Sequence, residues 1–225
     1  MCGRVVQAMS WAEIHHLLSI HSEPPEQAEP RYNVAPATQV QMVLPLENGG
    51  RLASVRWGWR PHWAQDRAAP INARAETVST SRFFRAIWPH RMLCPISGWY
   101  EWVDEGGPKK QPYYIRRRDG APTFCASIGQ VHDESRDDDG FVIITADALG
   151  GMVDVHDRRP VAFAPELARE WLDPATPRER AEQMLQHGEG PETFAWHRVD
   201  RAVGNVRNQG PHLVEPVEKP SRHQL

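Results

Sequence analysis

Proline and glycine occur along the whole chain, and this distribution limits the fold more than any other feature. Of the 225 residues, 20 are proline and 16 are glycine, and they are not gathered into one linker. Proline cannot donate a backbone hydrogen bond, and glycine favours turns over regular structure. A chain interrupted this often is expected to form many short strands joined by turns, with few long helices.

Alternating and continuous apolar runs predict where the strands and helices lie. The predicted strands are residues 39–46, 52–59, 91–96, 99–103, 112–117, 123–130, 141–145, 161–164 and 194–199. Short helices are predicted at residues 10–20, 81–88, 165–172 and 177–187, the first capped by Ser10 and the third begun by Pro165. Polar loops are predicted at residues 22–30, 48–50 and 133–140. These patterns predict an α+β, β-rich fold.

The length and composition favour one domain with one core. Hydrophobic residues make up 40% of the chain, enough to bury a sizeable interior. We predict a single domain over residues 1–216 and a polar tail over residues 217–225. No run approaches the roughly 18 apolar residues of a transmembrane helix. Because the first residues also lack the pattern of a signal peptide, we expect a cytoplasmic protein with no membrane contact.

The cysteine and histidine spacing argues against a metal centre. Cys2, Cys94 and Cys125 have neither the even number of a disulfide framework nor the CxxC spacing of a zinc site. His156 lacks a partner at the His-x-x-x-His spacing of a metal-binding helix. We therefore expect reduced thiols, no metal and no other cofactor.

The charge is unevenly distributed. The formal net charge of −3 by itself disfavours a nucleic-acid partner. Within residues 51–91, however, eight arginines face only two acidic residues, Asp66 and Glu76. A concentrated basic segment attracts phosphate groups more than the total charge suggests. The alternative is a solvated, arginine-rich surface, which charge alone favours.

Cys2 offers unusual chemistry because it follows the initiator methionine. Methionine is normally removed when the next residue is small, which would leave one residue with a free α-amine and a thiol. Their ordinary pKa values, about 7.7–8.0 and about 8.5, leave both groups reactive near neutral pH. With an aldehyde, the amine forms a Schiff base and the thiol then closes a five-membered thiazolidine ring. A cysteine at this position also arises by chance, and by itself that is the better prediction.

Asn72, Arg74 and Glu76 form a second candidate group. If this segment is extended, period-2 spacing puts the three side chains on one face. An amide, a guanidinium and a carboxylate together suit a polar pocket with a phosphate clamp. A surface strand with a salt bridge is equally consistent with the pattern.

Glu101 and His156 are candidate proton carriers. Glu101 lies in the aromatic run at residues 97–102 (SGWYEW), where desolvation raises the pKa of a carboxyl group and makes it a candidate general acid. His156 precedes a charged turn and can transfer a proton near neutral pH. The alternatives are an outward-facing glutamate and a histidine satisfied by a local hydrogen bond, and each is favoured for its residue taken singly.

Tryptophans alternate with basic residues at residues 57–63 (WGWRPHW). Aromatic faces beside arginine suit single-stranded nucleic acid, since bases stack and phosphates form ion pairs. We expect Trp57 and Trp59 to belong to the core, and Trp63 to be a candidate for stacking on bases.

Seven segments, taken together and in order, resemble the SOS response-associated peptidase (SRAP) family. They are residues 1–4 (MCGR), 31–38 (RYNVAPAT), 57–63 (WGWRPHW), 71–77 (INARAET), 97–102 (SGWYEW), 156–160 (HDRRP) and 203–211 (VGNVRNQGP). The resemblance covers nearly the whole chain. It implies a curved antiparallel sheet or barrel-like core with short peripheral helices and a positively charged cleft.

The resemblance also implies an activity and a set of catalytic residues. In this family the mature amino-terminal cysteine, here Cys2, links to the ring-opened aldehyde of an abasic site in single-stranded DNA and forms a thiazolidine. Asn72 matches the asparagine that holds the sugar and the amino terminus. Glu101 matches the acid/base glutamate that assists ring opening and reversal, and His156 matches the histidine that shuttles a proton.

Four further residues are implied to bind DNA. Arg4 and Arg74 match the family's phosphate-binding arginines, and Trp63 matches an aromatic residue near the bend of the strand. Pro36 lies in the matching loop near the lesion. The partner is then abasic single-stranded DNA, and we expect a monomer without metal.

Two alternatives stay open. The first is an amino-terminal-nucleophile or cysteine peptidase, with Cys2 as nucleophile and His156 as base, acting on itself or on its DNA adduct. The second is a non-catalytic module that binds single-stranded DNA through Trp63 and the arginines.

Overall fold

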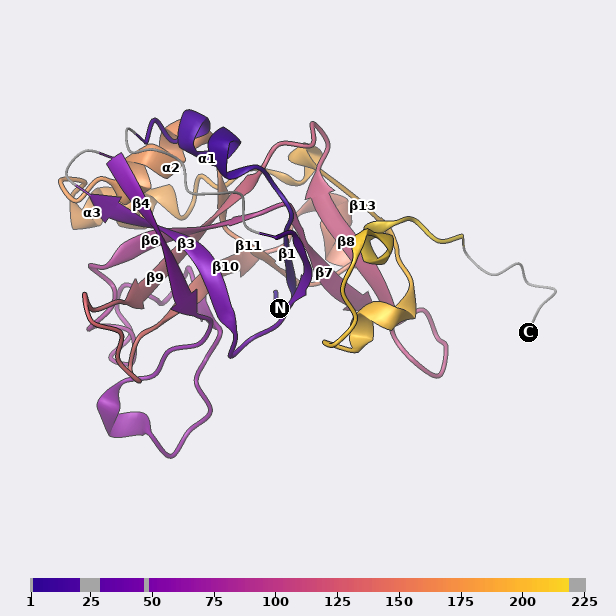
Figure 1. The fold of residues 1–225 in the computed structure, drawn as a ribbon, viewed down its shortest axis with the longest axis horizontal. Helices are drawn as coiled ribbons and strands as arrows, with labels where there is room; N and C mark the ends of the chain where they lie inside the picture. The colour runs from indigo at the N-terminus through magenta and orange to yellow at the C-terminus, as the bar shows by residue number, and fades with distance from the viewer. Residues whose placement is uncertain (1, 21–28, 47–48, 219–225) are drawn as a thin grey trace.

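The computed structural model describes residues 2–20, 29–46 and 49–218 (Figure 1). Most of the loop predicted at residues 22–30, Asn48 and the tail from residue 219 lie outside the described residues. Met1, whose removal is predicted, lies outside them as well. In the described part of the chain, no helix has the length and apolar content needed to cross a membrane.

Five strands form the smaller sheet, which is antiparallel throughout. In spatial order they are β13 (Phe194–Arg198), β8 (Gln111–Arg117), β7 (Gly98–Val103), β1 (Val5–Gln7) and β2 (Arg31–Val34). Because β1 lies between β7 and β2, the segment that contains Cys2 leads directly into this sheet rather than hanging free of it.

Eight strands form the larger sheet. Six follow one path: β11 (Arg158–Pro160), β10 (Gly140–Asp147), β9 (Thr123–Gln130), β6 (Arg91–Ile96), β3 (Gln39–Leu46) and β4 (Gly49–Arg56). The short β12 (Ala162–Phe163) pairs with β9, and β5 (Asn72–Arg74) pairs in parallel with β10. The expected β-rich, mainly antiparallel fold is confirmed. Within the described residues both sheets are open, so the barrel-like shape holds only loosely.

The helices are short and peripheral, as expected. The α-helices of the described residues are α1 (Trp11–Leu17), α2 (Pro165–Leu172) and α3 (Arg178–Met184), and they gather on one side of the molecule (Figure 1). Helix α2 packs against β6 and β9, and Arg169 on α2 donates a hydrogen bond to the carbonyl of Leu17 at 2.6 Å. Short 3-10 turns are η1 (His62–Ala64), η2 (Gly150–Asp154), η3 (Pro191–Thr193), η4 (Arg201–Gly204) and η5 (Pro211–Val214).

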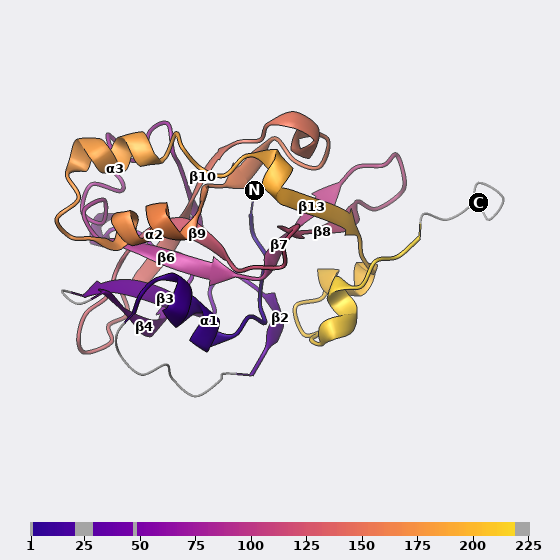
Figure 2. The ribbon, with the colours of Figure 1, turned by 90° about the horizontal axis from the view of Figure 1, so that it is seen from above.

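Two of the three apolar clusters in the described residues lie on the two faces of the larger sheet; the third contains Tyr100 and Tyr114 and joins the smaller sheet to the segment around Val203 and Leu213. One apolar cluster joins this sheet to the helices, with Trp171 and Ile14 among its buried members. A second cluster fills the space between the two sheets and contains all three cysteines. The view from above shows the chain's C-terminal segment beside the smaller sheet, at the end opposite α2 and α3 (Figure 2). Because Cys2 belongs to the second cluster, it lies in the space between the two sheets.

Residues 81–88 do not form the predicted helix; they form hydrogen-bonded turns. The backbone N–H of Trp88 bonds to the carbonyl of Phe84 at 2.9 Å, which closes a single turn. Phe83 and Phe84 pack against Trp59, with ring centroids 6.1 and 6.5 Å from it. The apolar spacing of this segment therefore reflects packing of Phe83 and Phe84 on the core and not a helix. Aromatic residues have only a weak preference for helix.

The strand predicted at residues 161–164 is wrong in its extent. Val161 donates to the carbonyl of Ile144 on β10 at 2.9 Å, and the next two residues pair with β9 as β12. The chain changes partner strand here, so one run of apolar residues belongs to two pairings. By contrast, β6, β9 and α2 have the bounds predicted from the sequence.

Candidate active site

Cys2 lies between the two sheets and is fully buried, with 0% of its surface exposed. It packs in one apolar cluster with Cys94 and Cys125. The amide Nδ2 of Asn72, on β5 of the larger sheet, donates a hydrogen bond to the carbonyl of Cys2 at 2.9 Å. The buried Oδ1 of Asn72 accepts no hydrogen bond from the described residues. Asn72 thus holds the backbone at Cys2 through Nδ2, while its Oδ1 atom can still accept a further hydrogen bond.

The Cys2 thiol is harder to ionise than an ordinary cysteine. Burial raises its pKa well above the usual value, and the neighbouring Cys125 and Glu101 raise it further. The expectation that this thiol is reactive at its ordinary pKa is therefore wrong. In the folded protein it stays protonated near neutral pH, so any reaction at sulfur needs a nearby proton acceptor.

Glu101 points into the interior from β7. Its side chain is buried, with 3% of the residue exposed, so the outward-facing alternative is wrong. Burial, with a smaller contribution from Asp157, raises the pKa of Glu101 to about 7. Apolar side chains, Trp99 and Ile115 among them, surround Glu101 and shield its carboxyl group from water. A carboxyl group with this pKa has both protonation states available near neutral pH, as acid/base catalysis requires.

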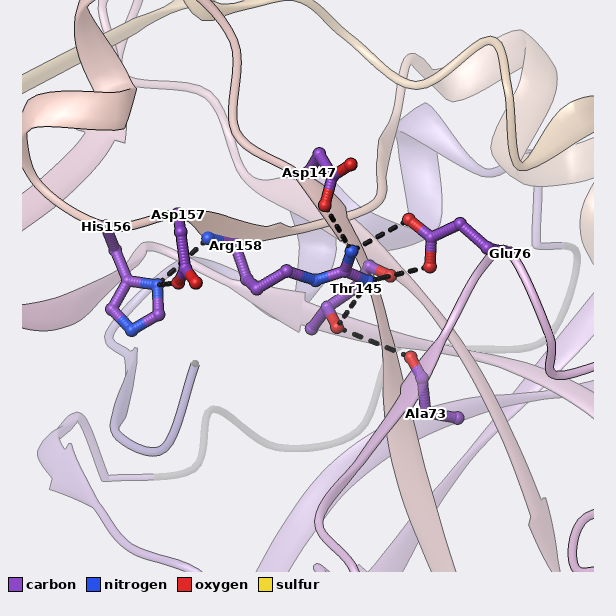
Figure 3. A network of polar contacts seen from close by, with 7 residues as sticks. All are labelled: Ala73, Glu76, Thr145, Asp147, His156, Asp157 and Arg158. Carbon is purple, nitrogen blue, oxygen red and sulfur yellow. Dashed lines mark hydrogen bonds and ion pairs between the residues drawn. The ribbon is translucent and has the colours of Figure 1, made fainter.

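His156 lies beside Glu101 and contacts its neighbours along the chain. Its Nε2 atom is 3.9 Å from Oε2 of Glu101. Its Nδ1 atom accepts a hydrogen bond from the backbone N–H of Arg158 at 2.9 Å and lies 2.7 Å from Oδ1 of Asp157 (Figure 3). The local hydrogen bond that was the alternative to a catalytic role is present, and it does not exclude that role because Nε2 still faces Glu101.

Burial also decides which partner carries the proton. It lowers the pKa of His156 below the usual value, and the charge of Asp157 opposes this effect. Since the pKa of Glu101 is raised to about 7, the carboxyl group is protonated more readily than the imidazole. Near neutral pH the pair therefore consists of a partly protonated Glu101 and a neutral His156.

Glu76 does not share the face predicted for it. Strand β5 ends at Arg74 and turns follow, so Asn72 and Arg74 keep their expected spacing but Glu76 does not. Glu76 instead forms an ion pair with Arg158 at 2.8 Å, which was the alternative for this segment. The hydrogen bond from Arg158 lowers the pKa of Glu76.

Arg4 is partly buried. Its Nη1 atom donates to Oδ1 of Asn33 at 2.6 Å and to the carbonyl of Val203 at 2.8 Å. The guanidinium carbon lies 5.5 Å from the ring centroid of Trp102. Arg4 is two residues after Cys2 in the chain, and these contacts hold its side chain where the segment of residues 203–211 meets β2.

The other candidate DNA-binding residues lie at the surface. Arg74 is exposed at the end of β5, and Pro36 is partly exposed between β2 and β3. Trp63, on η1, is 51% exposed and packs edge-on against Phe83 at 5.7 Å. Trp57 and Trp59 are buried, which confirms that they belong to the core.

Sequence reasoning missed Arg158 and its acceptors on β10, Thr145 and Asp147. The HDRRP segment directed attention to His156, and nothing local shows that the next arginine bonds to residues 11 and 13 positions earlier. Within the described residues, His132, Asp138 and Asp139 have ligand atoms close enough to hold a metal ion. They lie in the acidic loop between β9 and β10, apart from Cys2.

Comparison with known proteins gives one family and several similar chains. The sequence model of the family described as SOS response associated peptidase (SRAP) matches residues 1–206. The abasic site processing protein YedK of Escherichia coli (strain K12) is 45% identical over 224 residues, which cover 96% of this chain and 100% of that protein. The abasic site processing protein YoqW of Bacillus subtilis (strain 168) is 30% identical over 223 residues, covering 96% and 99%.

A solved structure has the same architecture. The crystal structure of a phage-related protein from Bordetella bronchiseptica superimposes with a TM-score of 0.77 at 39% identity. The match covers 89% of this chain and 95% of that one.

Proposed function

This chain belongs to the SRAP family, and from that premise we propose that it acts on abasic sites in DNA by bonding covalently to them through Cys2. The resemblance found in the sequence is confirmed by the family match over residues 1–206 and by 45% identity to an abasic site processing protein. The proposal is supported by the way Asn72, Glu101 and His156 come from separate segments and gather around one cysteine.

The proposed substrate is a single strand that lacks one base. Arg4 and Arg74 would bind phosphates on either side of the lesion, since a guanidinium matches phosphate geometry. Trp63 has the exposure that stacking on a base requires, and Pro36 lies in the loop expected near the lesion. Double-stranded DNA is disfavoured because the strand must bend sharply to bring the sugar to a buried cysteine.

The reaction has two bond-forming steps. After removal of Met1, the Cys2 amine adds to C1′ of the ring-opened sugar, and loss of water gives a Schiff base. The sulfur of Cys2 then adds to the same carbon, the thiol proton leaves, and the nitrogen takes up a proton as the thiazolidine closes. The adduct hides the aldehyde and so protects the strand from β-elimination.

Glu101 is proposed to manage the protons. Its protonated form donates to the sugar ring oxygen as the ring opens, and its ionised form then accepts the thiol proton when sulfur attacks. A pKa of about 7 makes both forms available, and the raised pKa of the Cys2 thiol makes such an acceptor necessary. His156 donates from Nε2 to the sugar oxygens, and Asn72 orients Cys2 and binds the opened sugar.

The observation that carries the proposal is the burial of the Glu101 carboxyl group close to the thiol of Cys2, where desolvation raises the pKa of Glu101 to about 7. To test it, uracil-containing single strands are treated with a glycosylase and mixed with the protein. A product that survives denaturing electrophoresis is expected from the wild type and not from Cys2→Ala.

Two further variants sharpen the assay. Cys2→Ser retains the amine, so it should give a product only after borohydride traps the Schiff base. Cys125→Ala alters the same buried cluster without changing Cys2, and it should react like the wild type. Equal yields of stable product from the wild type and Cys2→Ala would overturn the proposal.

The two alternatives fit the site less well. A cysteine peptidase requires a thiol with a lowered pKa, whereas burial raises the pKa of Cys2. A purely non-covalent DNA-binding module does not require an interior carboxyl group such as Glu101. Such a module would bind DNA equally well after Cys2→Ala and form no denaturation-resistant product.

A further inference from the structure

Arg158 is the centre of a polar network beside the site (Figure 3). Its side chain is 10% exposed. Nη1 and Nη2 donate to the two carboxylate oxygens of Glu76 at 2.8 and 3.0 Å. Nη1 also donates to Oδ1 of Asp147 at 2.5 Å, and Nη2 donates to the carbonyl of Thr145 at 2.6 Å. The guanidinium is therefore held by acceptors from three positions.

These contacts hold Arg158 on an edge strand, at the end of its pairing with β10. Arg158 is the first residue of β11, opposite Asp147 at the end of the β10 ladder. A bidentate carboxylate pair holds the planar guanidinium in one orientation, more firmly than a single exposed ion pair does. Because Glu76 follows β5 and Thr145 lies on β10, the network joins the start of β11 to two other strands.

The backbone of Arg158 in turn determines the state of His156. Its N–H donates to Nδ1 of His156 at 2.9 Å. A backbone N–H can only donate, so Nδ1 must offer a lone pair, and the proton of the neutral imidazole must be on Nε2. Nε2 is the atom that faces Oε2 of Glu101, 3.9 Å away.

We propose that Glu76 and Asp147 are positioning residues, which act through Arg158 to hold His156 in the tautomer that directs its Nε2 proton toward Glu101. The inference rests on the proposed function in so far as His156 takes part in that reaction. Neither carboxylate contacts the substrate; their effect on the rate comes from the orientation of an imidazole two residues away from the guanidinium that they bind.

Asp157 cannot perform this task. Its Oδ1 atom lies 2.7 Å from Nδ1 of His156, but a carboxylate only accepts, so it bonds to Nδ1 only when the imidazole is protonated there. Arg158 and Asp157 therefore favour opposite states of Nδ1, and the network around Arg158 favours the neutral one.

The first test needs no DNA. Nitrogen-15 chemical shifts of the His156 ring distinguish a protonated nitrogen from one with a lone pair, measured in the full-length protein above the pKa of His156. The wild type should show a single tautomer with the proton on Nε2. In the double variant Glu76→Gln/Asp147→Asn, the signals should shift toward a mixture of the two tautomers.

The second test measures adduct formation as a function of abasic DNA concentration. The double variant should lower the rate at saturating DNA by roughly tenfold, part of what a positioned acid or base contributes. The DNA concentration at half-saturation should not change. The matched control is Glu170→Gln, which removes the charge from another bidentate carboxylate–arginine pair, that between Glu170 on α2 and Arg180 on α3. Within the described residues this pair has no hydrogen bond to Arg158 or His156, so the variant should leave both readouts unchanged.

The outcomes separate this inference from the proposed function. An unchanged tautomer in the double variant, or a change equal to that in Glu170→Gln, overturns the inference while leaving the covalent chemistry intact. An effect confined to half-saturation would mean that the carboxylates act on DNA binding, which also overturns it. Failure of the wild type to form any adduct would defeat the proposed function, and the ring nitrogen measurement would still decide the tautomer.

Discussion

Two asparagines differ in how fully their side chains are hydrogen-bonded: Asn33 and Asn72, the latter in the candidate active site. Asn33 and Arg4 together bind residues 203–208, and we call this group of contacts the clamp. Asn33 on β2 is 2% exposed and accepts a hydrogen bond from Arg4 at 2.6 Å. Its Nδ2 atom donates to the carbonyls of Val203, Asn205 and Asn208 at 3.1, 3.0 and 3.0 Å. Asn72 donates to Cys2, and its buried Oδ1 accepts nothing from the described residues.

The difference teaches how to distinguish a polar residue that serves the fold from one that serves chemistry. The saturated Asn33 contributes stability, because each of its buried polar atoms is paired. In the candidate site, Oδ1 of Asn72 accepts no hydrogen bond from the described residues, and the Glu101 carboxyl group is held in a poorly solvated place; both features reduce stability. Substitutions should therefore lower stability at the clamp and lower the reaction rate at the site.

The largest expected effect concerns Glu101. Its folded pKa of about 7 is above the ordinary 4.5, so the folded protein binds more protons than the unfolded chain between these values. Stability from this group is present below pH 4.5 and is lost as pH rises to 7, by about 3 kcal/mol. Glu101→Gln should flatten this slope in denaturant unfolding at several pH values, and slow adduct formation roughly 100-fold.

Loss of rate above pH 7 is expected in the wild type, because the proposed ring-opening step uses the protonated carboxyl group of Glu101. If the free energy of unfolding of the wild type does not fall between pH 5 and pH 7, the ionised Glu101 does not destabilise the fold. The proposed contrast between Glu101 and Asn33 would then be wrong.

The next effect is at the clamp. Asn33→Ala leaves the carbonyls of the 203–208 segment and the Arg4 guanidinium without their partner, and should lower the free energy of unfolding by about 2–3 kcal/mol. The adduct-forming rate per folded molecule at saturating DNA should stay near that of the wild type. Urea unfolding and single-turnover kinetics measure the two quantities, and a rate loss greater than the stability loss would place Asn33 in the site instead.

A smaller effect is expected at Asn72. Asn72→Ala removes the hydrogen bond to Cys2 and the free acceptor, so the adduct-forming rate should fall about tenfold. Stability should change by less than about 1 kcal/mol, since only one hydrogen bond with the protein is lost. Asn33→Ala and Asn72→Ala should be compared in the same two assays, urea unfolding and single-turnover kinetics. Equal losses of stability and of rate in the two variants would show that the two asparagines do not differ in role.

The smallest effect is predicted for Asp157. Its charge raises the pKa of His156 against the effect of burial, so Asp157→Asn should lower that pKa. Because the carboxylate is 84% exposed, the decrease in the pKa should be small. Titration of the His156 ring by NMR measures it, and an increase in the pKa would contradict the assignment of neighbours around Nδ1.

Local patterns predicted much of the fold because they report local physics. Strands β6 and β9 lie where continuous apolar runs place them, since both are buried on two sides. Helix α2 begins at Pro165, as the proline predicted. Residues 81–88 failed because the apolar spacing that suggested a helix is satisfied by packing of Phe83 and Phe84 on Trp59, which no local pattern encodes.

The sequence by itself determined the candidate residues: a cysteine at position 2, a glutamate among aromatics and a histidine before a charged turn. Side-chain identity fixes which atoms can attack, donate or accept, so those candidates could be named in advance. Only the tertiary structure decided their states. It turned Glu101 inward, raised the pKa of the Cys2 thiol and fixed Nδ1 of His156 through Arg158, because desolvation and hydrogen bonding depend on residues far apart in the chain.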